Sequence, residues 1–287
     1  MSEISCSHDY INSRDGTRLH TVHWQAPAQI RARLVFIHGW AEYIGRYQFP
    51  VSWFQPRGFA CHGLDYRGHG ESEGRPGYVR NWHEYLDDVE AFLRTIPRAN
   101  DVPIFLVGHS QGGLIVSRLI EERGDFGLTG LILSSPFFAL GRELTLVEKL
   151  MSRVLSRIAP IMPLPSGVGS EGISKDPDVV RAYENDPKIV KKPLARWGNE
   201  LMNAQASVVV DAPRVKLPCL LMGGTDDPIV STDRIRDFYE ACGSEDKTLE
   251  MFEGLRHEIF NEVERADVFA CMESWLDGQL SSQSVSI

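Results

Sequence analysis

Cysteine is scarce in this sequence, and long apolar runs and an excess of basic residues are absent. The five cysteines are odd in number and lie far apart, and no C-x-x-C pair occurs. Neither a disulfide framework nor a zinc site is therefore indicated. No apolar run approaches the roughly 20 residues that a membrane span needs. The formal net charge of −9 argues against a nucleic-acid partner, which would favour a clustered basic surface.

The N-terminal residues 1–16 have neither the basic segment nor the apolar segment of a secretory signal peptide. Together with the cysteine pattern, this leads us to expect a cytoplasmic protein with reduced thiols. Cys61 and Cys219 lie in apolar runs and are expected to be small core residues. The 287 residues are 43% hydrophobic, which allows one α/β domain with an insertion or two small domains.

The most informative stretch lies at residues 104–120. Its apolar start, Ile104 to Val107, predicts a strand that is buried on both faces. A G-x-S-x-G turn with Ser110 at its centre follows, and apolar residues then recur at helical spacing. Such a turn between a strand and a helix is typical of a nucleophilic serine, because it exposes the Oγ near the N terminus of the helix. We expect Gly108 and Gly112 to flank it because a Cβ there would collide with a neighbouring element.

A second match to G-x-S-x-G, residues 70–74 with Ser72 at its centre, lacks this context. No apolar strand ends at Gly70, and Arg75-Pro76-Gly77 follows in place of a helix. We therefore predict Ser110, not Ser72, as the nucleophile. The glycine-rich residues 65–70 lack the spacing of a phosphate loop, and we expect their polar side chains to hold neighbouring loops.

Strands and helices alternate on both sides of the Ser110 turn. Residues 8–36 contain two alternating segments, 18–24 and 33–37, which we interpret as an antiparallel hairpin that leads into the first buried strand. Further strands are expected at residues 59–64, 128–133, 217–222 and 248–252, and helices at residues 46–54, 82–96, 231–241 and 263–276. This alternation predicts an α/β fold with right-handed crossovers and a mostly parallel sheet flanked by helices.

The alternation stops at residues 137–205, which show no clear strand and contain six prolines. This segment is too long for a bare loop, so we predict a helical cap inserted into a core of residues 1–136 and 206–287. The cap contains an apolar stripe, formed by Leu144, Val147, Leu150, Met151, Val154, Leu155 and Ile158. A basic stripe on another face of the same helix consists of Lys149, Arg153 and Arg157.

Two interpretations of this cap helix are open. Its apolar stripe can meet a lipid–water interface, where the basic residues would face anionic headgroups. Alternatively, the apolar stripe covers a pocket and the charges are merely solvated, which is the simpler interpretation.

Two late loops offer the partners that a nucleophilic serine needs. The loop at residues 223–230 contains Asp226 and Asp227, and spacing alone does not choose between them, although Pro228 favours an extended backbone at Asp227. His257 alone among the nine histidines lies on the loop after the last strand, downstream of Ser110 and both aspartates. Serine, acid and histidine in this order along the chain indicate a catalytic triad with His257 as the base.

An oxyanion loop is expected where the strand at residues 33–37 ends in His38-Gly39-Trp40. Gly39 lets the backbone turn so that the N–H of Trp40 faces the cleft. The N–H of Gln111, directly after the nucleophile, would be the second donor. An ordinary strand-to-helix loop would also fit, but the nearby nucleophile favours an oxyanion hole.

The sequence resembles the monoacylglycerol lipase and lysophospholipase family of α/β-hydrolases from about residue 14 to residue 276. The resemblance rests on HGWAEYIGRY (38–47), GLDYRGHGESEG (63–74), GHSQGG (108–113), D-P-x-V-V-x-A-Y-x-x-D-P (176–187), GTDDPIV (224–230) and GLRHEIFNE (254–262). It implies Ser110 as the nucleophile and His257 as the base. It also implies that Asp227, rather than Asp226, is the acid, and that the N–H groups of Trp40 and Gln111 form the oxyanion hole.

The resemblance implies a serine ester hydrolase that releases a fatty acid from monoacylglycerols or lysophospholipids through an acyl-enzyme, without a metal or other cofactor. The family often has a small residue and a glycine after His-Gly, whereas this chain has Trp40 and Ala41, which changes the pocket's shape and the acyl preference. A carboxylesterase, thioesterase or lactonase of the same fold, or a non-catalytic receptor, remains an alternative. We also expect a lipid ester substrate, transient contact of the cap with a membrane or micelle, and a cytoplasmic location that is peripheral to membranes.

Overall fold

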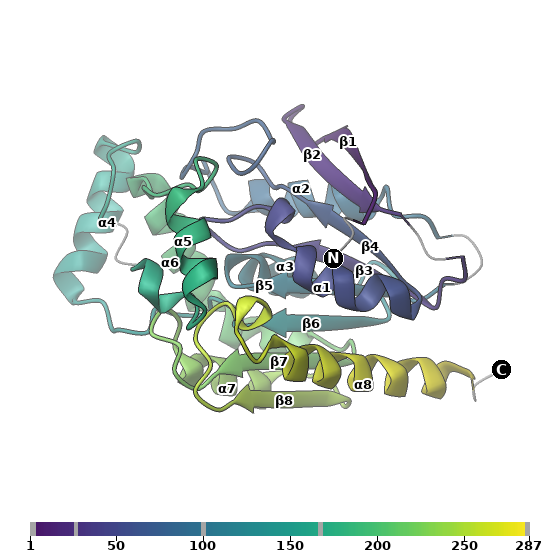
Figure 1. The fold of residues 1–287 in the computed structure, drawn as a ribbon. Coiled ribbons are helices and arrows are strands. Elements are labelled where there is room, and N and C mark those ends of the chain that lie inside the picture. Colours follow the sequence, from purple (N-terminus) through teal and green to yellow (C-terminus); the bar gives the residue numbers. More distant parts are fainter. Residues whose placement is uncertain (1–3, 26–27, 99–101, 166–168, 285–287) are drawn as a thin grey trace.

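The computed structural model of the chain describes residues 4–25, 28–98, 102–165 and 169–284. Helices cover both faces of a central sheet, and a helical cap lies at one end of it (Figure 1). The strands lie side by side in the order β1-β2-β4-β3-β5-β6-β7-β8. Their bounds are β1 (Cys6–Asn12), β2 (Arg18–Trp24), β3 (Ala32–Ile37), β4 (Phe59–Leu64), β5 (Ile104–His109), β6 (Gly130–Ser134), β7 (Cys219–Gly224) and β8 (Lys247–Phe252).

The strands from β3 to β8 pair in parallel. Strands β3, β5, β6 and β7 are buried along their whole lengths, which explains their nearly continuous apolar sequences. The carboxyl ends of the parallel strands point toward the cap, as the β6 arrow shows in Figure 1. The loops that follow these strands therefore meet at one edge of the sheet. The prediction of a mostly parallel sheet flanked by helices is confirmed.

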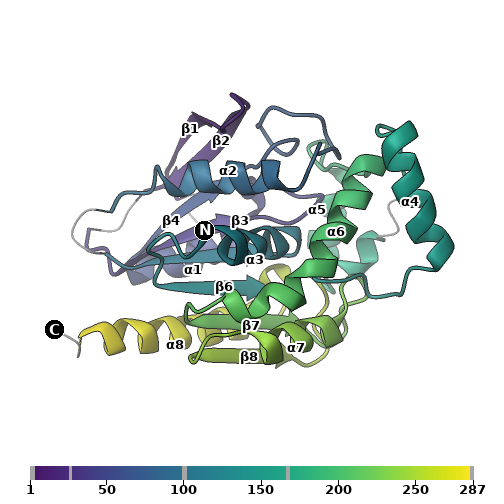
Figure 2. The same ribbon diagram turned by 180° about the vertical axis from the view of Figure 1, so that it is seen from behind.

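Two apolar layers join the helices to the sheet. Their helices are α1 (Gln48–Phe54) and α8 (Arg265–Ser284) on one face, and α2 (His83–Leu93), α3 (Gln111–Arg123) and α7 (Thr232–Ala241) on the other. The second group lies in front of the sheet in the view of Figure 2. Both Cys61 and Cys219 are fully buried within these layers.

The predicted N-terminal hairpin exists, but its strands differ from those expected. Strand β2 pairs antiparallel with β1 and then with β4. Residues 33–37 belong to β3, which lies between β4 and β5 and pairs in parallel with both. The reason is burial: β3 is apolar and fully covered, whereas the polar residues of β1 are mostly exposed and suit the edge of a sheet.

The cap contains α4 (Leu146–Ile158), α5 (Pro177–Asn185) and the first part of α6 (Ala195–Asp211). Among the described residues of the segment 137–205, extended pairing is limited to two isolated bridges, Leu140–Val230 and Pro163–Leu194. Helix α6 continues beyond residue 205 and also packs against α3 and α7 of the core. It therefore ties the cap to the core, and the domain boundaries at residues 136 and 205 remain predictions.

Helix α4 begins with a capping box in which the side chains of Thr145 and Glu148 each accept a hydrogen bond from the other's backbone N–H. It packs mainly against α6 and leaves much of its apolar stripe in solvent. Val147, Leu150 and Ile158 are 70%, 60% and 75% exposed. The stripe therefore covers a pocket along one side only. The interpretation in which the stripe covers a pocket explains this side of α4, but it does not explain the apolar residues in solvent. Within the described residues, no helix is long and apolar enough to cross a membrane.

Candidate active site

The turn between β5 and α3 holds Ser110 in a strained backbone conformation, with φ 51° and ψ −119°. The Ser110 N–H donates to the carbonyl oxygen of Ser134 at the end of β6, 2.9 Å away. A Cβ on Gly112 would lie 2.2 Å from the carbonyl oxygen of Ile37, and one on Gly108 would lie 2.8 Å from that of Gly112. Glycine is therefore required on both sides, because the turn packs directly against backbone atoms.

Ser110, His257 and Asp227 lie together in one line of hydrogen bonds. The Nε2 of His257 is 2.8 Å from the Oγ of Ser110, and its Nδ1 is 2.7 Å from Oδ2 of Asp227. The other carboxylate oxygen of Asp227 accepts the N–H groups of Ile229 and Val230, at 2.8 and 3.0 Å. Asp226 is exposed, so the structure brings Asp227, and not Asp226, to the imidazole.

The contact between His257 and Asp227 shifts the pKa values of both groups. Burial favours the neutral imidazole, but the adjacent Asp227 carboxylate outweighs burial and raises the pKa of His257 above its usual value. Burial likewise opposes ionisation of Asp227, but the imidazole and the two backbone N–H donors hold the pKa of this carboxyl below its usual value. An ionised Asp227 beside His257 is the arrangement that stabilises an imidazolium formed during proton transfer.

The loop after β3 lies against Ser110. A Cβ built on Gly39 would be 2.9 Å from the Cβ of Ser110, so only glycine lets the loop come this close. Trp40 lines the same small cavity as Ser110, and Gln111 directly follows the serine. The backbone N–H of neither residue has a hydrogen-bond acceptor among the described residues. The amide of Gln111 belongs to the first turn of α3, whose N–H groups have no partner within the helix. Both amides are thus available to an oxygen atom of a ligand.

The glycine-rich loop after β4 holds the Gly39 loop in place. The Tyr66 hydroxyl donates to the Gly39 carbonyl at 2.7 Å, and the Asp65 carboxylate accepts the N–H of Ile44 at 2.7 Å. Ser72 donates its hydroxyl to the carbonyl oxygen of Asp65. Ser72 therefore has a structural role within this loop, and its hydroxyl lies outside the Ser110–His257–Asp227 line.

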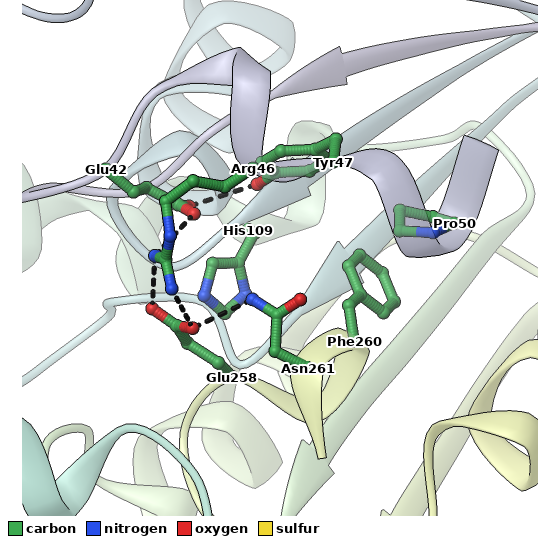
Figure 3. A pocket seen from close by; sticks show the side chains of 8 residues that line it. All are labelled: Glu42, Arg46, Tyr47, Pro50, His109, Glu258, Phe260 and Asn261. Atoms are coloured by element: carbon green, nitrogen blue, oxygen red, sulfur yellow. Dashed lines mark hydrogen bonds and ion pairs between the residues drawn. The ribbon is translucent and has the colours of Figure 1, made fainter. Parts of the chain in front are cut away.

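A buried charge cluster next to His257 was not predicted from the sequence. Arg46 donates two hydrogen bonds to the Glu258 carboxylate, at 2.7 and 2.8 Å, and lies 3.4 Å from Oε2 of Glu42. Figure 3 shows the guanidinium between the two carboxylates, with His109 beside it. The motifs HGWAEYIGRY and GLRHEIFNE contain these charged residues, but nothing in the two motifs indicates that the residues are buried together.

Glu42 connects this cluster to the Gly39 loop. Its Oε1 accepts the backbone N–H of Gly39 and the hydroxyl of Tyr47. Burial and the nearby Glu258 carboxylate raise the pKa of Glu42 to about 7. Burial also opposes ionisation of Glu258, but the guanidinium of Arg46 outweighs it and holds the pKa of Glu258 below its usual value. One buried cation thus lies between two carboxyl groups, and Glu258 loses its proton at a lower pH than Glu42.

Besides a cavity of about 10 Å³ beside Arg46, two larger cavities adjoin this edge of the sheet. The smaller one, about 30 Å³, is lined by Ser110, His257 and residues of the surrounding loops. The larger one, about 460 Å³, lies between α4, α6 and the core, and its lining is mostly apolar. The Arg142–Glu148 ion pair, 2.8 Å apart, supplies the charged part of this lining. No group of three or more potential metal ligands occurs in the part of the chain that the structure describes.

The parallel sheet, the serine at the strand-to-helix turn and the histidine loop after the last strand define an α/β-hydrolase. Residues 28–264 match the hydrolase family described as serine aminopeptidase, S33, and the chain belongs to this family.

Relatives and solved structures agree with this assignment. The chain is 34% identical to phospholipase YtpA of Bacillus subtilis over 255 residues, which cover 88% of this chain and 98% of that protein. It is 30% identical to the monoacylglycerol lipase of Mycolicibacterium smegmatis over 270 residues, which cover 92% and 95% of the two proteins. A soluble variant of the monoglyceride lipase of Saccharomyces cerevisiae, in complex with a substrate analog, has a similar structure. Its TM-score is 0.85 at 25% identity, with 97% of this chain and 96% of that chain covered. The predicted family, fold and enzyme class, a serine ester hydrolase, are confirmed.

Proposed function

We propose that this enzyme hydrolyses monoacylglycerols or lysophospholipids through an acyl-enzyme on Ser110. One observation carries the proposal: a serine hydrogen-bonded to a buried histidine and aspartate lies beside an apolar cavity of about 460 Å³. A cavity of this size is in the range of small-molecule sites. Burial of each methylene group in such a cavity is favourable by about 0.8 kcal/mol, so a fatty acyl chain is a suitable ligand. The names of the relatives, a phospholipase and a monoacylglycerol lipase, support the same substrate class.

The acylation step uses the proposed catalytic residues in turn. The Nε2 of His257 accepts the hydroxyl proton while the Oγ of Ser110 forms a bond to the ester carbonyl carbon. The carbonyl electron pair moves to oxygen, and the N–H groups of Trp40 and Gln111 stabilise the resulting oxyanion. The imidazolium, stabilised by Asp227, then protonates the departing alcohol, glycerol or the glycerophospho group, as the C–O bond breaks.

Deacylation repeats these steps with water. His257 removes a proton from a water molecule, whose oxygen attacks the acyl carbon. The tetrahedral intermediate collapses, Ser110 regains its proton from His257, and the fatty acid is released. In each step Asp227 keeps the imidazole in the orientation in which Nε2 faces the serine.

We further propose that α4 brings the enzyme to a lipid surface. The exposed apolar residues Val147, Leu150 and Ile158 lie on a helix that also carries the exposed basic residues Lys149 and Arg153. A helix with these two kinds of residue can lie in a membrane interface, with its apolar side among the acyl chains and its charges near anionic headgroups.

A hydrolysis panel tests the proposed substrate class. It compares monoacylglycerols, lysophospholipids, triacylglycerols and nitrophenyl esters of increasing acyl length, with the Ser110→Ala variant as the blank. We expect the highest kcat/KM with a long-chain monoacylglycerol or lysophospholipid. A clear maximum with short, water-soluble esters would instead identify a general carboxylesterase, thioesterase or lactonase.

Two further assays address the remaining alternatives. A fluorophosphonate should label Ser110, because labelling needs an activated serine; a protein that is never labelled would be a receptor. Amino-acid nitroanilides test peptide hydrolysis, which would need a free carboxylate for the substrate's ammonium group. The two buried carboxyl groups near the serine, Glu42 and Glu258, are already engaged by Arg46 and Gly39, so we expect no turnover of nitroanilides.

A further inference from the structure

Three residues line both cavities at the active-site edge. Trp40, Phe137 and Ile229 border the small chamber that contains Ser110, and they also border the large apolar cavity. Ser110 and His257 border only the small chamber, whose volume is about 30 Å³. Any acyl chain that is bound to Ser110 and extends into the cavity of about 460 Å³ has to pass these three side chains.

Trp40 is the one of the three that belongs to the loop with the proposed oxyanion donor. Its indole packs against the indole of Trp197 on α6, with the ring centroids 5.2 Å apart and the ring planes at 35°. The loop after β3 is therefore in direct contact with the cap across the passage. The indole N–H groups of both tryptophans are buried, and neither has a hydrogen-bond partner among the described residues.

The backbone on both sides of Trp40 is fixed. The carbonyl of Gly39 accepts the Tyr66 hydroxyl, and the N–H of Gly39 donates to Glu42. Ala41 has a φ of 58°, a conformation that few residues other than glycine adopt. Since the loop backbone is held, the passage at this loop widens when the indole of Trp40 rotates or when Trp197 moves with the cap, and rotation of Phe137 or Ile229 would widen its other sides.

We propose that the indole of Trp40 separates the chamber of Ser110 from the apolar cavity and thereby determines which acyl groups are accepted. This inference rests on the proposed function and names a specificity-determining residue for it. Only short acyl groups fit the chamber of about 30 Å³ and react without displacing the indole. Longer groups reach the apolar cavity only by parting the contact between Trp40 and Trp197.

The experiment measures how fast alkyl fluorophosphonates label Ser110, because a single chemical step then reports access to the serine. A short ethyl reagent and a dodecyl reagent are compared below the concentration at which they form micelles, so that contact of α4 with lipid does not contribute. For Trp40→Ala we expect the dodecyl-to-ethyl ratio of labelling rates to rise about tenfold. Trp40→Phe should give a smaller rise, and Trp197→Ala should raise the ratio in the same direction.

Trp53→Ala is the matched control. Trp53 is a half-buried tryptophan on α1 that donates a hydrogen bond to Glu273, and it lines neither cavity. Its loss should leave the ratio unchanged. Thermal melting of each variant shows whether it is folded. If Trp40→Ala does not fold, Trp40→Phe and Trp197→Ala still decide the question.

The outcomes separate the partition from the proposed function. A ratio that stays constant or falls in the Trp40 variants overturns the partition, because the indole would then be an ordinary wall that contacts the chain. A wild-type enzyme that is labelled but hydrolyses no lipid ester overturns the proposed function, while the labelling ratio still tests the partition. A rise with Trp197→Ala alone would assign the barrier to the cap and also contradict the inference.

Discussion

The loops around Ser110 and the cap helix α4 border neighbouring cavities but are held in place in opposite ways. Around the serine, the loops are fixed by hydrogen bonds that Glu42 and Asp65 accept and Tyr66 donates, and these three side chains are buried. Helix α4 packs mainly against α6, and much of its apolar stripe faces solvent. The two regions therefore meet two different physical requirements. Proton transfer needs fixed distances between a few atoms, whereas a surface for lipid needs exposed apolar area and no fixed partner.

The largest effect on activity is expected when Ser110, the proposed nucleophile, is removed. Ser110→Ala should lower kcat by about 10⁶-fold, because the acyl-enzyme can no longer form. The readouts are turnover of nitrophenyl butyrate and labelling by a fluorophosphonate. Ser72→Ala is the control, and its activity should stay within a few-fold of wild type, because Ser72 lies outside the triad. Equal turnover by Ser110→Ala and wild type would contradict the proposed mechanism.

The second largest effect on activity is expected when Asp227, the proposed acid, is replaced. Asp227→Asn should lower kcat by about 10⁴-fold, because an amide neither orients the imidazole correctly nor stabilises its charged form. Asp226→Asn is the matched control, and its exposed side chain predicts little change. Similar losses in both variants would contradict the assignment of the acid to Asp227.

The dependence of kcat/KM on pH tests the role of Asp227 in a second way. His257 must be neutral to act as the base, so activity is lost as the pH falls through its pKa. Asp227 raises this pKa, and the acid limb of kcat/KM should therefore have its midpoint above the usual histidine value of 6.5. In Asp227→Asn the residual activity should have its acid limb at a lower pH. An unmoved limb would mean that another group controls it.

A smaller effect is expected from Glu42, which holds the loop of the proposed oxyanion donor without touching the substrate. Glu42→Ala removes the acceptor of the Gly39 N–H, and the displaced loop should lower kcat/KM about 10²-fold. Glu42→Gln keeps a carbonyl oxygen at this position and should retain most of the activity. Equal losses in the two variants would show that the charge, rather than the hydrogen bond, is needed.

The raised pKa of Glu42 also predicts that the free energy of unfolding depends on pH. Its pKa rises from an ordinary 4.5 to about 7 on folding, so the folded state binds the proton more tightly than the unfolded state. This contribution stabilises the fold at low pH and is lost as the pH rises from about 4.5 to 7. Urea unfolding over this range should show a weaker decline for Glu42→Gln than for wild type. Parallel curves would contradict a raised pKa at this residue.

The smallest effect should come from α4. Val147→Ser combined with Leu150→Ser should lower the hydrolysis of monoacylglycerol in vesicles about tenfold, because less apolar area enters the interface. Hydrolysis of soluble nitrophenyl butyrate should not change. The control is Val263→Ser, which removes an apolar side chain that is 61% exposed and lies outside the cap. An equal effect of the control would mean that α4 is not the contacting surface.

The sequence predicted those parts of the molecule that local pattern and chain order determine. The buried strands have apolar runs, and the Ser110 turn has its glycines because backbone atoms pack against it. The polar strand β1 was not recognised, because an exposed edge strand has no apolar pattern to detect. The periodicity of α4 predicted an apolar stripe, but it did not reveal that only one side of the helix has a neighbour. The choice between Asp226 and Asp227 depends on which side chain the loop buries, which spacing does not encode.

The ion cluster around Arg46 illustrates a further limit. Glu42 and Glu258 are separated by more than 200 residues, and their shared cation becomes evident only when the loops meet at the edge of the sheet. Charged residues in a loop are usually solvated, so the sequence offered no physical reason to expect these to be buried. The cluster is a product of tertiary packing.

The base of the cap is attached to the histidine loop. The N–H of Glu258, the residue directly after His257, donates to the carbonyl of Ile173 at 2.7 Å. Near the start of the chain, Tyr43 donates its hydroxyl to Asp186, just beyond α5. An engineer who grafts a foreign cap onto this scaffold to change its substrate should thus exchange α4 and retain residues 173–186, since a chimera without them would lose an anchor of the loop that carries His257, the proposed general base.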